Sequence, residues 1–93
     1  MSMIHKYALP PGPGSFRVDL PKGAVILCVQ TQGDMPFLWA QFTEGVPPTI
    51  YDSRTIHVFG TGRAIRDDVN LRYIGTYQQM GGAFVLHCFD ELP

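Results

Sequence analysis

The sequence predicts an all-β fold, a small sandwich or barrel of six to seven mostly antiparallel strands. Eight prolines and ten glycines interrupt the chain at short intervals, and the runs between them are rich in Val, Ile, Phe, Tyr and Thr. Residues 15–20 alternate strictly, with Phe16, Val18 and Leu20 on one face, as in a half-buried strand. Because no repeat or linker divides the 93 residues, we expect one domain over residues 1–93.

The strands are expected between the turn-forming residues. The last two flank Met80-Gly81-Gly82 and are expected to form a β-hairpin, and the fifth is expected to break near Asp52. The predicted strands cover residues 4–9, 15–20, 24–32, 36–43, 49–59, 71–78 and 83–89.

Loops are expected where proline and glycine gather. The prolines of residues 10–14 remove backbone donors, so no strand can continue through that stretch. A second loop is expected over residues 44–48. Residues 63–70 are ambiguous, since the part from Ile65 to Asp68 suits either one helical turn or a plain loop.

Residues 24–29 are apolar on both faces of their predicted strand. A strand with one face in water would alternate, so this one is expected either between two layers or under another subunit. Charged residues make up only 16% of the chain, against about 25% in typical soluble domains. We therefore expect a homo-oligomer.

Charge and hydropathy exclude several classes of partner. The net charge is −1, without the basic surplus that nucleic-acid binding usually requires. The longest apolar run, residues 24–29, is far shorter than a membrane span, and the first nine residues lack the apolar region of a signal peptide. We expect a cytoplasmic protein with no nucleic-acid or membrane partner.

Neither the cysteines nor the histidines predict a metal site. Cys28 and Cys88 belong to no CxxC pair and have no histidine at zinc-ligand spacing, so both are expected as reduced core thiols. His5, His57 and His87 fall in separate predicted strands, and His87 is expected as a satisfied core histidine. We expect no metal and no cofactor.

The sequence also lacks a recognisable catalytic constellation. No nucleophile elbow of the G-x-S-x-G type occurs, and Asp67-Asp68 is expected in a solvated turn. Nucleophilic catalysis needs a nucleophile, a base and an orienting group together in space. We expect a protein that is not an enzyme.

One loop is a candidate ligand site. Successive amides in Gly60-Thr61-Gly62 could form an anion-binding nest, and Arg63 and Arg66 could donate charge-assisted hydrogen bonds to phosphate. The alternative is a tight turn in which the glycines only supply positive φ angles.

Aromatic residues could complete such a site by stacking on a base. Trp39 and Tyr77 are the candidates for this contact, although a tryptophan in a segment such as Leu38-Trp39-Ala40 is more often a core residue. Together the loop and these rings would bind a small phosphorylated molecule.

Several segments resemble a family of small uncharacterised proteins of bacteriophage and prophage genomes. The resemblance is most specific at residues 59–62, 73–76, 81–82 and His87, and it extends from Ile4 to Glu91. It implies a phage accessory protein in the cytoplasm of the bacterial host. By analogy with other small phage proteins, the role would be an oligomeric sponge for a nucleotide immune signal, a module that blocks a host protein, or a virion-associated accessory.

Overall fold

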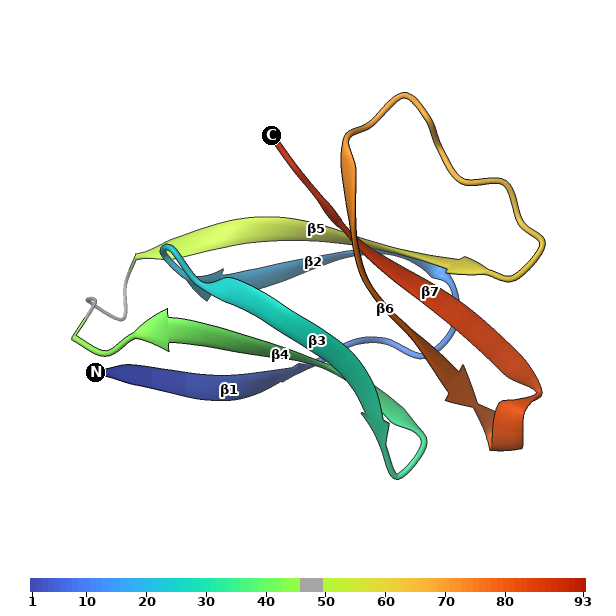
Figure 1. Ribbon diagram of the computed structural model, residues 1–93, viewed down its shortest axis with the longest axis horizontal. Coiled ribbons are helices and arrows are strands. Elements are labelled where there is room, and N and C mark those ends of the chain that lie inside the picture. The colour runs from blue at the N-terminus through green and yellow to red at the C-terminus, as the bar shows by residue number, and fades with distance from the viewer. Residues whose placement is uncertain (46–49) are drawn as a thin grey trace.

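The computed structural model describes residues 1–45 and 50–93, and it is a sandwich of two antiparallel sheets (Figure 1). The predicted all-β fold is confirmed, and of the two predicted architectures the chain adopts the sandwich. In sheet order, the three-stranded sheet contains β1 (Ser2–Ala8), β4 (Met35–Thr43) and β3 (Val25–Gln32). The four-stranded sheet contains β2 (Gly14–Pro21), β5 (Tyr51–Gly60), β7 (Phe84–Glu91) and β6 (Leu71–Gln79).

Most sequence predictions of the strands differ from the structure only at the ends. The predicted start of the fifth strand, Thr49, and residues 46–48 of the predicted loop lie outside the described residues. The break expected near Asp52 is wrong. β5 runs on because its pairing with β2 continues through Asp19↔Ser53 and Leu20↔Asp52, and the Asp52 carboxylate accepts a hydrogen bond from the Gly23 amide (2.9 Å).

Two tight turns connect neighbouring strands. Gly33 and Asp34 both have positive φ, as expected of a two-residue hairpin turn between β3 and β4. The 3-10 turn Met80–Gly82 joins β6 to β7, which confirms the predicted hairpin. By contrast, residues 61–70 form a loop without the helical turn considered for Ile65 to Asp68. This loop carries the chain from β5 past β7 to β6 (Figure 1).

The strand that was expected to be buried on both faces is an edge strand. β3 lies at the edge of the three-stranded sheet, and a bulge between Ile26 and Cys28 adds one residue to it. The bulge turns Ile26 and Val29 into the core and leaves Leu27 and Cys28 between them on the outward side. The prediction of a central position between two layers is therefore wrong, because no layer of the described chain covers its outward side.

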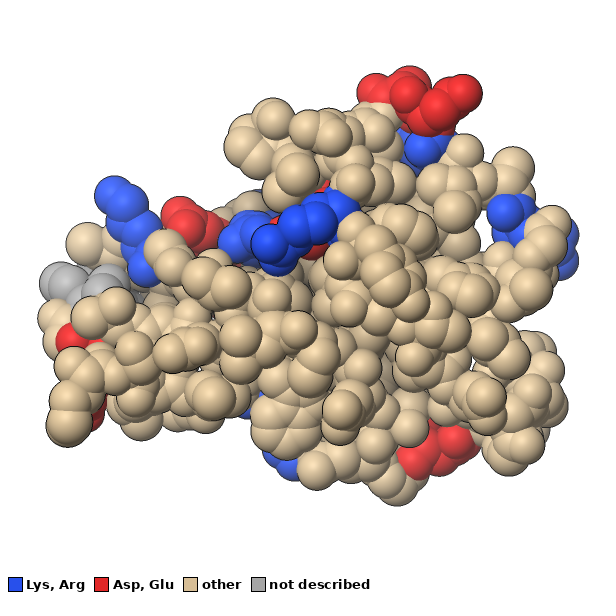
Figure 2. All heavy atoms as spheres, in the orientation of Figure 1, with Lys and Arg blue, Asp and Glu red and all other residues tan. Residues whose placement is uncertain are grey.

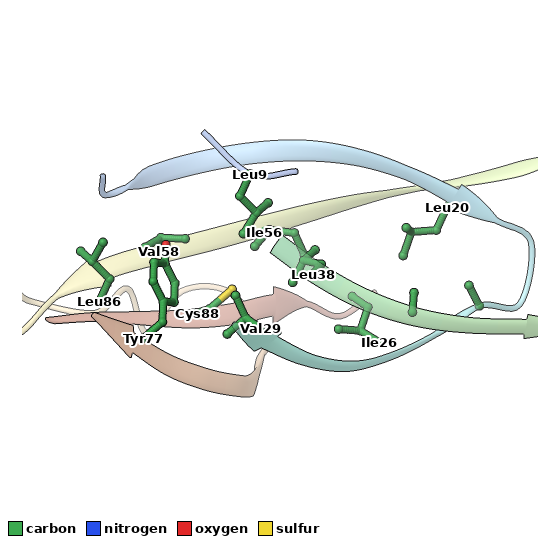
Figure 3. Packing of buried hydrophobic residues seen from close by; sticks show 12 residues of the cluster. Leu9, Leu20, Ile26, Val29, Leu38, Ile56, Val58, Tyr77, Leu86 and Cys88 are labelled. Atoms are coloured by element: carbon green, nitrogen blue, oxygen red, sulfur yellow. The ribbon is translucent and has the colours of Figure 1, made fainter. Parts of the chain in front are cut away.

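The core lies between the sheets. Leu38 and Ile26 of the three-stranded sheet point towards Ile56, Val58 and other residues of the four-stranded sheet (Figure 3). The alternation predicted for β2 is confirmed, since Leu20 is fully buried and Phe16 and Val18 pack against the core. At the β3–β6 side the sheets approach closely, where a Cβ on Gly75 would lie 3.0 Å from a methyl group of Val29.

One ion pair is buried with the apolar core. The Asp90 side chain is fully buried and bonds to the Arg54 guanidinium, and Arg72 lies 3.7 Å away. Arg54 also donates to the Ala24 carbonyl at 3.4 Å and so links the four-stranded sheet to the start of β3. Within residues 1–45 and 50–93, no helix has the length and apolar character needed to cross a bilayer.

Candidate functional site

An apolar cavity opens at the end of the sandwich where three connections meet. Its volume is about 500 Å³, within the range of sites that hold small molecules or single side chains. We call it the end pocket. Its walls come from the β1–β2 connection, the β3–β4 turn and the β6–β7 turn, through Pro11, Gly12, Pro13, Gly33, Asp34, Met35, Gln79, Met80, Phe84 and Leu86.

A buried glutamine fastens these connections together. The Gln79 carboxamide accepts a hydrogen bond from the Gly12 amide (3.3 Å) and donates one to the Asp34 carbonyl (2.9 Å). The Asp34 carboxylate in turn accepts from the Met80 amide at 2.8 Å. Residues far apart in sequence are thereby held in one arrangement, so the pocket is preformed.

The backbone of Met80 is strained at the same place. Among the described residues, Asp34 (φ 67°) and Met80 (φ 53°) are the only non-glycine residues with positive φ, and both line the end pocket. Asparagine and aspartate tolerate this conformation, whereas methionine does not favour it. Strain of this kind persists where the surroundings impose it, and it gathers at functional sites.

The rim of the pocket is apolar and open to solvent. Met80 is 66% exposed and Phe84 54% exposed, and Met35 is also exposed. Among the described lining residues there is no Lys or Arg. The pocket can therefore take up an apolar group, and its methionines can adapt their shape to that group.

The predicted Gly60–Arg63 loop is a tight turn at the end of β5. The Arg63 amide donates to the Gly60 carbonyl (3.1 Å), the Thr61 amide donates to the Val85 carbonyl (3.2 Å), and Gly62 has a φ of 85°. Two amides of the proposed nest are therefore bonded within the chain. This geometry favours the turn interpretation, and the ligand site at this loop stays a prediction.

The other predicted ligand residues do not gather at that turn. Arg66 forms an ion pair with Asp68 through two hydrogen bonds (3.0 and 2.9 Å), which holds the pKa of this carboxyl below its ordinary value. Trp39 lies on the outer face of the other sheet. Tyr77 is a core residue whose pKa burial raises to about 12, so its ring offers no face to a base. Arg63 makes no ion pair with any residue in the described ranges.

The structure also reveals a hydrogen-bonded chain that sequence reasoning missed. Ser15 Oγ lies 2.8 Å from His57 Nδ1, and His57 Nε2 lies 2.8 Å from Glu91 Oε1. The three residues come from β2, β5 and β7, and only the strand register Ser15↔His57 could have revealed their proximity.

These three hydrogen-bonded side chains follow the order nucleophile, base and carboxylate, which activates serine in hydrolases. Acyl transfer would further require donors about 3 Å from a developing oxyanion. The same arrangement also satisfies both ring nitrogens of a buried imidazole, which any buried histidine requires.

The prediction for His87 needs a correction. Its side chain is satisfied, but on the outer face of the four-stranded sheet and not in the core. Its ring nitrogens lie 2.7 Å from the Thr61 hydroxyl and 2.9 Å from the Thr76 hydroxyl, which contacts the Tyr73 hydroxyl at 2.5 Å. These bonds tie the Gly60–Arg63 turn to β6 and β7.

The two cysteines differ, and neither forms a disulfide. Cys88 is a core residue as predicted, and burial raises the pKa of its thiol to about 12. Cys28 is only half-buried because the bulge in β3 turns it outward beside Trp39. In the part of the chain that the structure describes, no group of three or more His, Cys, Asp or Glu side chains is placed to hold a metal ion.

The fold and the end pocket define the class: an all-β sandwich protein with a preformed apolar cavity at one end. The family model described as Domain of unknown function (DUF7352) matches residues 1–93, and the chain belongs to this family. No match to a curated protein or to a solved structure was found.

Proposed function

We propose that this protein is a non-catalytic binding protein whose end pocket receives an apolar side chain of a partner protein. The observation that carries the proposal is the coincidence of strain and apolar surface. The non-glycine residues held at positive φ both line the end pocket, and one of them, Met80, is also among its most exposed rim residues.

A protein partner suits the chemistry of this pocket better than a charged ligand. A single buried anchor residue in a preformed pocket is the usual centre of a protein interface. The lining contains no described cation that could meet phosphate, and its carboxylate, Asp34, would repel an anion. Rim methionines allow a fit to more than one anchor side chain.

A second candidate function rests on Arg63, which has no ion-pair partner among the described residues and follows the turn at Gly62. A guanidinium of this kind suits phosphate oxygens. The ligand would then be a nucleotide-type signal. Both candidates fit a phage accessory protein in the host cytoplasm, a role that we propose from the family resemblance: the first would block a host protein and the second would sequester a signal.

A single titration distinguishes the two candidates. Backbone amide NMR spectra are recorded while indole, a mimic of an apolar side chain, is added, and separately while a panel of nucleotides is added. We expect indole to shift the amides of Gly12, Gly33 and Gly81. Shifts with nucleotides confined to Thr61, Gly62 and Arg63 would favour the second candidate, and no indole shift at the end pocket would overturn the first.

The rim variant Met80→Gly tests whether the strain serves binding. Glycine accepts positive φ at no steric cost, so we expect the free energy of unfolding to stay the same or rise by up to about 1 kcal/mol. Indole affinity should fall because an apolar wall is lost. Ile65→Gly is the control, because Ile65 is 49% exposed and is not among the residues that line the end pocket, and it should leave indole binding unchanged. Equal affinity of Met80→Gly and wild type would contradict the proposal.

A further inference from the structure

The outer face of the three-stranded sheet is almost free of charge. Its strands contain no Asp, Glu or Arg, and Lys6 is their only lysine. Cross-strand register aligns the outward residues in rows, Ile4–Gln41–Val25 and Lys6–Trp39–Cys28. In the view of Figure 2 the surface over β3 and β4 is mostly uncharged, whereas charged residues gather over β5 and the loop after it. An outer face of a sandwich is normally polar when water covers it.

Large apolar side chains stand on this face and are exposed. Ile4 is 56% exposed, Val25 53% and Leu27 44%. They come from the two outer strands of the sheet, where Ile4 and Val25 flank Gln41 in one cross-strand row. Leu27 is there because of the bulge in β3, which turns an additional apolar residue outward.

The one charge on the face is already accommodated by its neighbours. Lys6 Nζ lies 4.6 Å from the centroid of the Phe37 ring and 6.0 Å from that of Trp39, and it donates to the Gln32 side chain at 2.7 Å. The ammonium group lies along the sheet and does not project from it. A covering surface therefore needs no carboxylate, and a neutral apolar surface fits best.

The area suits a reversible dimer. Three strands about 4.8 Å apart and about 27 Å long form roughly 400 Å² of sheet. Two such faces would bury at least about 800 Å², which is the size of weak, reversible interfaces.

We propose that this face is the interface of a symmetric homodimer, in which a second copy packs its own three-stranded sheet against it. In a two-fold interface the same patch occurs on both sides, so the patch must complement itself. A face with one tethered cation and no anion meets that condition, because copies have little charge to repel one another. The inference is independent of the end pocket.

The test combines light scattering with the fluorescence of Trp39, the only tryptophan, which lies on the proposed interface. At micromolar concentration we expect the wild-type protein to have the mass of two chains, and dilution to shift Trp39 emission as the dimer dissociates. Val25→Glu and Ile4→Glu place a charge at exposed positions that tolerate it in the monomer. Each should raise the dissociation constant at least tenfold.

Tyr51→Glu is the matched control, since Tyr51 is 54% exposed and lies in the other sheet. It should leave the dimer unchanged, and circular dichroism should show the same β-rich spectrum for all variants. The proposal would be overturned by a monomeric wild-type protein at micromolar concentration. It would equally be overturned by a dimer that both Val25→Glu and Ile4→Glu leave intact, or that Tyr51→Glu disrupts as strongly as they do.

Discussion

On the outer face of the four-stranded sheet, polar side chains bond to one another. Ser15, His57 and Glu91 form one hydrogen-bonded chain, and Thr61, His87, Thr76 and Tyr73 form another. On the outer face of the three-stranded sheet, apolar side chains are exposed and the one lysine lies over aromatic rings. The first face bonds many of its polar groups to one another, whereas the second exposes the large aliphatic side chains of Ile4, Val25 and Leu27.

This difference shows that strand alternation alone does not decide what an outward residue does. Both sheets send alternate side chains outward, but only the four-stranded sheet places acidic residues among them, at Asp19 and Glu91. A face that is complete within one chain suits solvent, and a face that is incomplete suits a partner. The following experiments test this contrast, beginning with the largest expected effect.

The largest effect on the free energy of unfolding is expected at the ion pair that Asp90 and Arg54 form inside the sandwich. Asp90→Ala leaves Arg54 without its buried partner, and breaking a buried ion pair typically costs about 3–5 kcal/mol. This is a large part of the total stability of a small domain, so urea unfolding should show a much lower midpoint. Asp68→Ala removes an exposed ion pair and should leave the midpoint unchanged. Equal effects of the two variants would contradict this account.

A second effect on stability depends on pH and comes from the buried thiol of Cys88. The folded protein raises the pKa of Cys88 to about 12, above its ordinary value of 9.0, and so favours the protonated thiol. This stabilisation is complete below pH 9 and is lost as the pH rises towards 12. Between pH 8 and pH 11 we expect a loss of about 3 kcal/mol from this group. The free energy of unfolding of Cys88→Ala should depend less on pH over that interval than that of the wild type, as urea unfolding at several pH values would show. Equal pH dependence of the two proteins would contradict this account.

An intermediate effect on the free energy of unfolding is expected where Gly75 of one sheet packs against Val29 of the other. In Gly75→Ala the new methyl group would lie 3.0 Å from Val29, and crowding in a packed core costs about 1–2 kcal/mol. The double variant with Val29→Ala should lose less stability than the sum of the single variants. Gly60→Ala is the control, because its Cβ would meet only the flexible Arg63 side chain at 3.6 Å. Additive losses would show that the two sites do not touch.

The smallest effect concerns the chain of Ser15, His57 and Glu91. Under the proposed non-catalytic function, a fluorophosphonate probe should not label the protein, and Ser15→Ala should cost about 1 kcal/mol for one lost hydrogen bond. Labelling that Ser15→Ala abolishes and Glu91→Gln weakens would mean that the serine is an activated nucleophile. That outcome would overturn the non-catalytic proposal.

The sequence predicted the fold through features that act locally. Proline and glycine end strands, and alternation at Phe16, Val18 and Leu20 marks one buried face, so the strand count and the hairpin at Met80–Gly82 could be foreseen. The bulge at Leu27 could not be predicted, because the sequence of residues 24–29 fits an unbroken strand equally well. It arises from pairing with β4, which the linear pattern does not contain.

The candidate site was much less predictable. Its walls come from residues near positions 12, 34 and 80, and only the fold brings them together. The signal for Met80 was weak, since a residue before Gly81-Gly82 has no reason in sequence to adopt positive φ. The glycines at positions 60 and 62 predicted an anion site instead, at a turn in which the amides of Thr61 and Arg63 are bonded within the chain.

The strand order also has a consequence for how the chain folds. The β3–β4 and β6–β7 hairpins join neighbours in sequence and can form in about 1–10 μs. β5 has no such neighbour, because it pairs with β2 on one side and β7 on the other, each distant in sequence. Closing these long loops precedes any gain from the contacts, so folding should be limited by the insertion of β5 and fall in the millisecond-to-second range of β-sandwiches. Until β5 is inserted, β2 and β7 expose unpaired edges, and the chain is then most vulnerable to aggregation.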